Sequence, residues 1–275
     1  LVATKGALEM TPEDRRVLKL YSGWGGLSLN AARDRFDREL PAEFPRPERR
    51  GLIHEYYTPT IVAEAVARIV GGLLRSLPKD KAAGQVLALE PSAGIGRFLK
   101  AFDAPKFSVL NWRAVEWSAL SSRMLGALYP ELDLFHGPFE RWVREYGDGV
   151  KGRLGLVVAN PPYGPRGAAV AEDSNRSYRE KAAYAYFLRR CLDLLAPNGL
   201  GVFLVPAGFL TGRSSRHHAL RKKVLLRHHL SAAYRLPSVG SDGREAVFPG
   251  AMLVTDLLFF RARGGTLPEV PEGDR

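Results

Sequence analysis

Short apolar runs alternate with helical patterns from residue 85 onwards. This alternation is typical of a parallel sheet whose two faces are both covered by helices. Seven runs are expected to be strands, at residues 86–89, 113–115, 132–135, 154–159, 201–205, 230–236 and 253–260. Helices are expected near residues 96–102, 118–128, 139–146, 180–195 and 214–228. The predicted fold class is therefore α/β, with a seven-stranded, mostly parallel sheet.

The first third of the chain has a different pattern. Thr11 and Pro12 have the character of a helix start, and apolar positions recur with a helical period over residues 60–77. Prolines and arginines cluster at residues 40–50, as in a connector. We therefore expect a helical extension and connector over residues 1–50, one main domain over residues 51–263 and a tail over residues 264–275.

Composition narrows the possible partners. The chain of 275 residues carries 40 Lys and Arg against 29 Asp and Glu, a net charge of +11, which favours a polyanionic partner such as nucleic acid. A generally Arg-rich protein with a solvated basic face is the alternative.

The single cysteine, Cys191, lies in an apolar helical pattern, so we expect a buried thiol, no internal disulfide and a reducing, cytoplasmic setting. No apolar run approaches the ~20 residues that span a bilayer, and the chain start lacks a signal sequence. Its first residue is Leu1, so processing and a fragment of a longer protein both stay open.

A glycine-rich turn follows the first predicted strand and precedes a helix. Gly94 and Gly96 would allow a ligand to approach the backbone, which fits a nucleotide-like cofactor. Leu99 stands where a dinucleotide fingerprint needs a third small residue, which disfavours a nicotinamide. Glu116 ends the second strand, where an acid typically binds ribose hydroxyls, and Trp117 could cover an adenine ring. Alone, either feature could be a chain reversal or a helix-start charge, but together they predict a cofactor site. The candidate residues are Glu90, Pro91, Ser92, Ala93, Gly94, Gly96, Glu116 and Trp117.

The tetrapeptide Asn160-Pro161-Pro162-Tyr163 directly follows the fourth strand. Two prolines force an extended turn whose carbonyls no helix can use. The Asn160 side-chain oxygen and the Pro161 carbonyl could accept both N–H bonds of an aromatic amino group and stabilise the charge that develops on its nitrogen. Tyr163 offers a ring against which a flipped base could stack. All four residues are catalytic candidates, although an isolated Asn-Pro-Pro would more simply be a stiff loop.

These motifs resemble, in identity and order, the N6-adenine DNA methyltransferases of the gamma arrangement. Tyr56-Tyr57-Thr58-Pro59 is similar to the family's first cofactor segment, and the resemblance runs over roughly residues 54–261. It implies a Rossmann-like class I methyltransferase fold with an N-terminal helical extension, and S-adenosylmethionine as the cofactor. It also implies DNA as substrate, base flipping, in-line methyl transfer and restriction-modification. On this resemblance the cofactor-binding candidates also include Tyr57, Thr58, Pro59, Phe139 and Asn160, and the second base-stacking candidate is Phe248.

The chain departs from the family pattern after the third strand. Gly137-Pro138-Phe139 stands where the family usually has Asp-Phe. Phe139 could still stack on the cofactor adenine, but Pro138 has no carboxylate for its amino group, so His136 or backbone would have to replace that contact. This departure bears on cofactor affinity.

The chain also suggests what binds the DNA. Cations gather on and before the predicted helix at residues 214–228, and a polar loop at residues 164–181 follows the catalytic turn. We expect the loop to be mobile and the helix to track phosphates, a solvated basic helix being the alternative. The DNA-contact candidates are Arg166, Arg213, Arg216, Arg221, Lys222 and Lys223. The histidine pairs lack Cys or acidic partners at metal-site spacing, so no metal site is expected.

Two observations point to a larger assembly. Residues 21–27 are similar to a segment that precedes the methylase core in phage and plasmid proteins that join methylase to helicase. Few residues follow the last strand, so a specificity or helicase module elsewhere is expected to choose the DNA. Methylation of a protein glutamine or an RNA base amine, and a catalytically silent DNA-binding or antirestriction module, are the competing interpretations.

Overall fold

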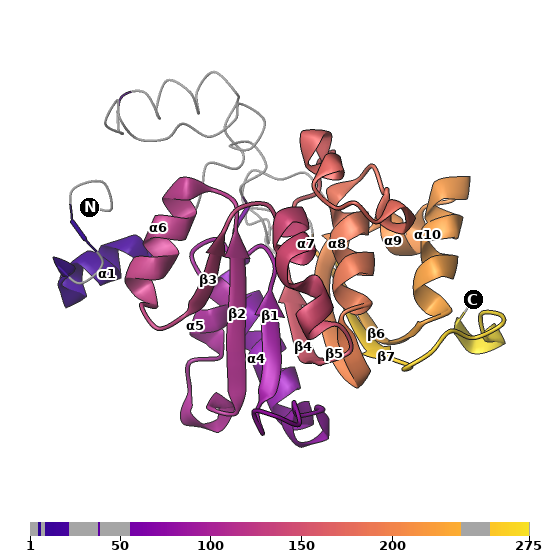
Figure 1. Cartoon of the computed structure of the whole chain (residues 1–275), viewed down its shortest axis with the longest axis horizontal. Helices are drawn as coiled ribbons and strands as arrows, with labels where there is room; N and C mark the ends of the chain where they lie inside the picture. The colour runs from indigo at the N-terminus through magenta and orange to yellow at the C-terminus, as the bar shows by residue number, and fades with distance from the viewer. Residues whose placement is uncertain (1–4, 7–8, 22–37, 39–55, 238–253, 275) are drawn as a thin grey trace.

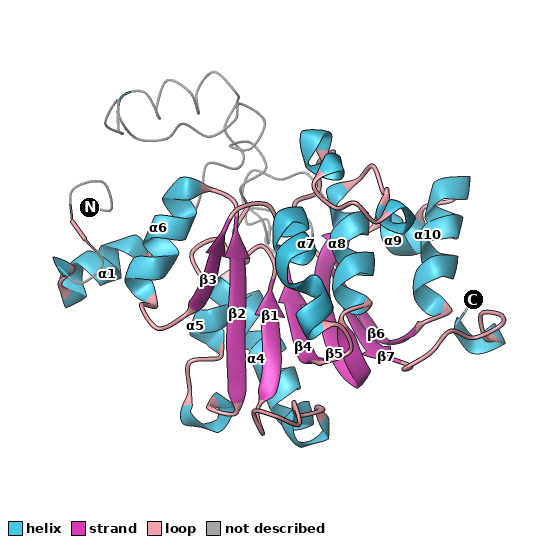
Figure 2. Cartoon of the chain, viewed as in Figure 1, coloured by secondary structure: helices cyan, strands magenta, loops and turns pink. Residues whose placement is uncertain are grey.

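The computed structural model describes residues 5–6, 9–21, 38, 56–237 and 254–274. Within them lies one sheet of seven strands, in the order β3-β2-β1-β4-β5-β7-β6 (Figure 2). The strands are β1 (Val86–Glu90), β2 (Leu110–Glu116), β3 (Asp133–His136), β4 (Leu154–Ala159), β5 (Leu195–Pro206), β6 (His228–Leu236) and β7 (Thr255–Ala262). Neighbours from β1 to β5 pair in parallel, and β7 pairs antiparallel with both β5 and β6. The predicted α/β fold with a mostly parallel sheet is confirmed.

Helices cover both faces of this sheet, as Figure 1 shows. The first part of the chain forms α1 (Pro12–Leu18), α4 (Thr60–Leu73), α5 (Arg97–Ala101) and α6 (Ala119–Leu128). The second part forms α7 (Phe139–Val150), α8 (Ala183–Leu192), α9 (Gly208–Thr211) and α10 (Ser215–Leu225). Short 3-10 turns lie at η2 (Leu74–Ser76), η3 (Pro105–Phe107), η4 (Gly167–Ala171), η5 (Arg176–Tyr178) and η6 (Glu272–Asp274).

Two apolar clusters hold these layers together. One joins α7, α8 and α10 to one face of the sheet, and the other joins α4 and α5 to the opposite face. All six residues of β4 are buried, since this strand has a neighbour on either side and a helix layer on each face. A strand buried on both faces has a continuous apolar sequence, and this explains why β4 could be predicted to the residue.

Local sequence sets the helix starts. The Thr11 side chain caps α1 and forms a reciprocal capping box with Asp14, and Ser214 caps α10. α8 is shorter than predicted, because β5 already begins at Leu195 rather than near residue 201. The apolar runs therefore located all seven strands, with boundaries that moved by up to six residues, whereas the short helix α9 and the 3-10 turns were not predicted.

The N-terminal helix α1 packs against the main domain. Met10 and Leu18 lie in an apolar cluster with Ile95 and with Leu120 of α6. The boundary expected at residue 50, most of the segment 21–27 and Phe248 lie outside the described residues.

Candidate active site

The carboxyl ends of β1, β2 and β4 lie at one edge of the sheet, because these strands are parallel neighbours (Figure 2). This edge is where open α/β sheets bind ligands. The glycine turn leaves β1, the Glu116 segment leaves β2 and the tetrapeptide leaves β4. The sheet thus brings together three motifs that the sequence keeps far apart.

The turn between β1 and α5 needs glycine at two positions. Gly94 and Gly96 have φ values of 56° and 78°, a left-handed conformation that favours glycine. The ring of Tyr57 occupies the space that a Gly94 side chain would need, and the Tyr57 hydroxyl lies 2.7 Å from the Ser121 hydroxyl. Tyr57, from the segment before α4, therefore packs directly on this turn.

Two carboxylates lie beside the turn. Glu116 accepts hydrogen bonds from the Gly94 amide at 2.7 Å and from the Ser118 amide at 2.6 Å. Glu90 is buried, and Oε2 of Glu90 has no hydrogen-bond partner among the described residues. Burial, with a contribution from the negative charge of Glu116, raises the pKa of Glu90 well above its usual range, although the Leu99 amide opposes the shift. This edge therefore contains a carboxyl that favours its protonated form.

Asn160 is fixed at both ends of its side-chain amide. The amide nitrogen donates to the Tyr56 carbonyl at 3.0 Å, and the amide oxygen accepts from the Tyr163 hydroxyl at 3.0 Å. The Tyr163 hydroxyl also lies 3.3 Å from the Leu204 carbonyl of β5. Burial raises the pKa of Tyr163, so its phenol stays a hydrogen-bond donor. The Asn160 oxygen is therefore held in one orientation.

A hydrogen bond joins the glycine turn to the tetrapeptide. The Ser92 hydroxyl donates to the Asn160 main-chain carbonyl at 3.1 Å. Pro161 is buried beside it, and its carbonyl accepts no hydrogen bond from another described residue. The Asn160 side-chain oxygen and the Pro161 carbonyl stay the predicted acceptors at this edge.

The residues at this edge fit S-adenosylmethionine. A left-handed glycine turn admits close approach of a ligand, and a carboxylate such as Glu116 has about four acceptor sites for ribose hydroxyls and amides. The unpartnered Oε2 of Glu90 offers a further polar contact. The Trp117 side chain is 54% exposed next to Glu116, where it could cover an adenine ring.

Phe139 does not lie where the sequence resemblance placed it. It is only 2% exposed, and its ring stacks on Trp142 at 5.7 Å and lies 4.9 Å from the Phe187 ring in the core. It turns inward because α7 and α8 bury their apolar faces against each other. Its expected stacking on a cofactor adenine is therefore not supported.

The prediction that Arg166 contacts DNA is wrong. We predicted a DNA contact, but the Arg166 side chain is 1% exposed and pairs with Glu140 of α7 at 2.8 Å. The loop that contains it was expected to be mobile, whereas Arg166 and its neighbours tie it to the body. Sequence reasoning missed Glu140 as well, because an acid in the first turn of a helix is usually a surface charge.

The other basic candidates divide into two groups. Arg213, Arg216 and Lys222 are exposed on and before α10. Arg221 instead donates to the Phe209 carbonyl of α9 at 2.8 Å, and Lys223 pairs with Glu180 at 3.1 Å. Arg213, Arg216 and Lys222 therefore remain as candidate phosphate contacts, whereas Lys223, although its side chain is 49% exposed, pairs with Glu180.

Cys191 is a free cysteine, and its side chain is buried, as its apolar pattern predicts. Burial raises the pKa of its thiol. Across the described ranges, no group of three or more His, Cys, Asp or Glu side chains could hold a metal ion. None of the helices described for this chain has the length and apolar character to cross a membrane.

One family model matches the sequence. It is described as Eco57I restriction-modification methylase and matches residues 127–239, less than half of the chain. The matched segment contains the Asn160 tetrapeptide, whereas the glycine turn and Glu116 precede it. No curated protein matches the chain by sequence.

Solved structures share the fold at low sequence identity. A protein of Listeria monocytogenes described as a class I S-adenosylmethionine-dependent methyltransferase has a TM-score of 0.58 and 15% identity, covering 99% of this chain and 73% of that one. The methyltransferase subunit of a type I restriction-modification system from Streptococcus thermophilus has a TM-score of 0.58 and 18% identity, covering 78% and 48%. DrdV, in a complex with DNA, has a TM-score of 0.56 and 17% identity, covering 88% and 30%.

This chain therefore spans less than half of the last two proteins. The description of the Listeria monocytogenes protein includes S-adenosylmethionine, the cofactor that the residues at this edge of the sheet fit. The chain has the fold of class I S-adenosylmethionine-dependent methyltransferases, and over residues 127–239 it matches the Eco57I restriction-modification methylase family.

Proposed function

We propose that this chain transfers a methyl group from S-adenosylmethionine to the N6 amino nitrogen of adenine in DNA. The observation that carries the proposal is the position of Asn160-Pro161-Pro162-Tyr163. The tetrapeptide leaves the carboxyl end of β4 and is joined to the glycine turn by the 3.1 Å bond from Ser92 to Asn160. An amino group held there would lie beside the candidate cofactor site.

The acceptors address the chemical difficulty of the reaction. An adenine amino nitrogen is a weak nucleophile, because its lone pair is delocalised into the ring. The Asn160 side-chain oxygen and the Pro161 carbonyl would accept its two N–H bonds and stabilise the positive charge that develops on nitrogen. S-adenosylmethionine, when bound, supplies a methyl group activated by a sulfonium. As the nitrogen–carbon bond forms and the sulfur–carbon bond breaks, the nitrogen becomes acidic and loses its proton to solvent, so no strong base is needed.

Other residues would position the two reactants. Tyr163 would stack on the flipped adenine, and Glu116 and Trp117 would hold the ribose and adenine of the cofactor. Phe248, outside the described residues, stays a candidate for the second face of the base. Thr58 and Pro59 would line the methionine end of the cofactor, and Thr58 is buried there at the start of α4.

DNA is the proposed substrate for two further reasons. The net charge of +11 favours a polyanion, and DrdV, which shares the fold, has been solved in a complex with DNA. We further propose that a specificity or helicase module outside residues 51–263 selects the sequence to be methylated, within restriction-modification.

The test is transfer of tritiated methyl from S-adenosylmethionine to duplex and single-stranded DNA of mixed sequence, followed by hydrolysis and chromatography of the bases. We expect label in N6-methyladenine, and loss of that label in Asn160→Ala. Label in cytosine, or equal labelling by wild type and Asn160→Ala, would overturn the proposal. Parallel reactions with RNA and with cell-extract protein test the other amine and amide substrates, and label confined to either of these would also overturn it.

A further inference from the structure

We propose that Arg166 and Glu140 are positioning residues, which hold the catalytic turn in register with the β3–α7 segment at the same edge of the sheet. The inference rests on the methyl transfer proposed above. It concerns two residues that touch neither the substrate nor the cofactor, and it begins from a charged pair in the interior.

The pair is almost completely closed to solvent. Nε of Arg166 donates to Oε1 of Glu140 at 2.8 Å, and the two side chains are 1% and 4% exposed. The Arg166 guanidinium lies 3.6 Å from the centre of the Tyr186 ring, a distance typical of a cation–π contact. Arg166 is therefore clamped between α7 and α8.

Arg166 also organises the loop in which it lies. Its Nη1 donates to the main-chain carbonyls of Tyr178 and Glu180 at 3.1 and 3.2 Å. At the base of the loop, Pro165 and Ala182 form an antiparallel bridge, and the Arg166 amide donates to the Lys181 carbonyl. One side chain thus ties both ends of this loop to the body.

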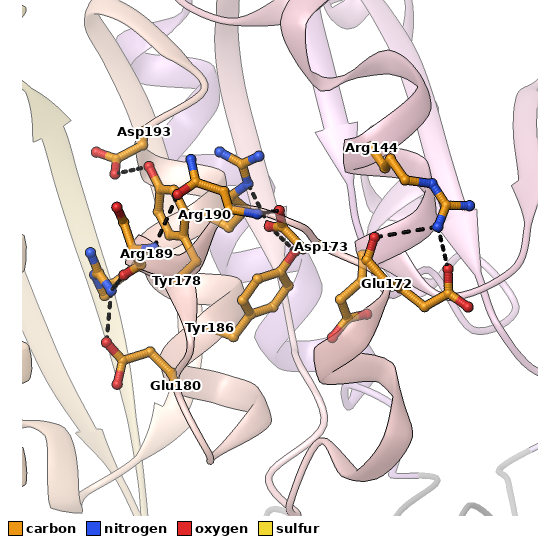
Figure 3. A network of polar contacts seen from close by, with 12 residues as sticks. Arg144, Glu172, Asp173, Tyr178, Glu180, Tyr186, Arg189, Arg190 and Asp193 are labelled. Atoms are coloured by element: carbon orange, nitrogen blue, oxygen red, sulfur yellow. Dashed lines mark hydrogen bonds and ion pairs between the residues drawn. The ribbon is translucent and has the colours of Figure 1, made fainter.

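The loop is also anchored farther along α8. Figure 3 shows Tyr186 and Arg190 converging on Asp173, and Tyr178 reaching Asp193. The Tyr186 hydroxyl donates to Asp173 at 2.9 Å, and the Tyr178 hydroxyl donates to Asp193 at 2.6 Å. A loop fixed over this length cannot absorb a displacement near residue 166, so that displacement would pass to the turn that precedes it.

The two partners come from the two functional segments. Arg166 follows Tyr163 by three residues, and Glu140 lies in the first turn of α7, directly after the Gly137-Pro138-Phe139 segment. Their ion pair therefore joins the catalytic turn to a segment whose Gly137 amide donates to the main-chain carbonyl of Glu116 at 2.9 Å.

Stability alone does not explain a pair of this kind. Burial raises the pKa of the Glu140 carboxyl, and the hydrogen bond from Arg166 acts in the opposite direction. Apolar residues of similar volume often replace a buried ion pair without loss of stability. A fixed distance and direction between α7 and the turn is what the pair provides and apolar residues would not.

The test uses the whole chain and the double variant Glu140→Gln/Arg166→Met, which removes the link without leaving a buried unpaired charge. The matched control is Arg144→Met, because Arg144 pairs with Glu172 on the same loop at 2.7 Å but the two side chains are 47% and 39% exposed. Methyl transfer is measured as kcat and KM for DNA. Amide hydrogen exchange is measured in parallel at the four residues of the segment 160–166 that have an amide hydrogen, Asn160, Tyr163, Gly164 and Arg166, and thermal unfolding confirms that each variant is folded.

We expect the double variant to lose about 10- to 100-fold in kcat with KM changed less than about threefold, the pattern of misplaced reacting groups. We expect faster exchange over residues 160–166 in the double variant, and Arg144→Met should match wild type in every measurement. A folded double variant with wild-type kcat and wild-type exchange would overturn the inference.

Two further outcomes are decided in advance. If the double variant is unfolded at the assay temperature, Arg166→Lys replaces it. Lysine keeps the positive charge but cannot bind Glu140 and the carbonyls of Tyr178 and Glu180 at the same time. A lowered kcat of Arg166→Lys supports the inference, and a wild-type kcat overturns it. If wild type transfers no methyl to DNA, the proposed function fails on its own. The exchange measurement then decides whether the pair holds the turn.

Discussion

The Tyr163 hydroxyl donates to the side-chain oxygen of Asn160 at 3.0 Å, so the residue expected to stack on the target base also orients the residue expected to accept its N–H bond. The bond from the Asn160 amide nitrogen to the Tyr56 carbonyl completes the constraint. An amide held at both ends loses little freedom when substrate binds. This preorganisation is the property that makes hydrogen-bond acceptors effective in a transition state.

This relationship separates two roles of Tyr163. Tyr163→Phe keeps the ring and removes the hydroxyl, so we expect a loss in kcat of about fivefold, the equivalent of one hydrogen bond of ~1 kcal/mol. Tyr163→Ala also removes the stacking surface, which is worth a further ~1–3 kcal/mol. Single-turnover methylation, with 2-aminopurine fluorescence at the target position as a report of base flipping, distinguishes the variants. Equal losses in Tyr163→Phe and Tyr163→Ala would contradict this division.

The glycine turn gives a second prediction. Gly94→Ala places a methyl group against the Tyr57 ring and forces alanine into a left-handed conformation, which costs ~1–2 kcal/mol. We expect a lower melting temperature and weaker S-adenosylmethionine binding by calorimetry. Gly72→Ala is the matched control, since Gly72 lies within helix α4 with nothing near its Cβ position, and it should be neutral or stabilising by up to ~1 kcal/mol. Wild-type cofactor affinity in Gly94→Ala would show that the turn does not form the cofactor site.

Apolar patterning was sufficient to predict the sheet. β1 and β4 lie in the middle of the sheet with helices on both faces, so their sequences are continuously apolar and easy to recognise. The strand order, which the sequence analysis did not predict, makes β1 a neighbour of both β2 and β4, so the carboxyl ends of these three parallel strands share an edge. The contact between Ser92 and Asn160 follows from that topology.

Side-chain direction could not be predicted in the same way. Arg166 stands in a polar loop, and nothing near it in sequence shows that Glu140, 26 positions earlier, lies in the interior. The Phe139 ring points towards Phe187 of α8. The packing of α7 against α8 sets this direction, and the local sequence Gly137-Pro138-Phe139 does not reveal it. Both errors concern tertiary partners that leave no local pattern in the chain.

The buried carboxyl of Glu90 predicts a pH dependence of stability. Because its pKa is raised in the folded chain, the fold holds this proton at pH values where the unfolded chain has lost it. The carboxyl therefore weakens the fold increasingly as pH rises above its ordinary value of 4.5. In the absence of cofactor, we expect Glu90→Gln to melt at a higher temperature than wild type at pH 8, with the difference vanishing as pH falls to about 4.

Glu131→Gln is the control for that experiment, since Glu131 is exposed in the turn before β3 and should show no comparable change. Thermal unfolding followed by circular dichroism over the pH series provides the measurement. A Glu90→Gln variant less stable than wild type at pH 8 would mean that the carboxylate is ionised and well partnered, contrary to its burial.

The exposed cations before and on α10 give the last prediction. Arg213 and Arg216 follow the carboxyl end of β5, at the same edge as the catalytic turn, so we expect them to bind DNA phosphates. Arg213→Ala/Arg216→Ala should weaken DNA binding for all sequences alike and reduce the slope of log K against log salt by about 2, roughly one for each phosphate that the variant no longer neutralises.

Lys79→Ala/Lys81→Ala is the matched control, because these exposed lysines precede β1 and lie at the opposite edge of the sheet. Fluorescence anisotropy with a labelled duplex over a salt series measures both slopes. Equal reductions in the two double variants would mean that the basic charge acts through the net field of the protein rather than through direct binding at the catalytic edge.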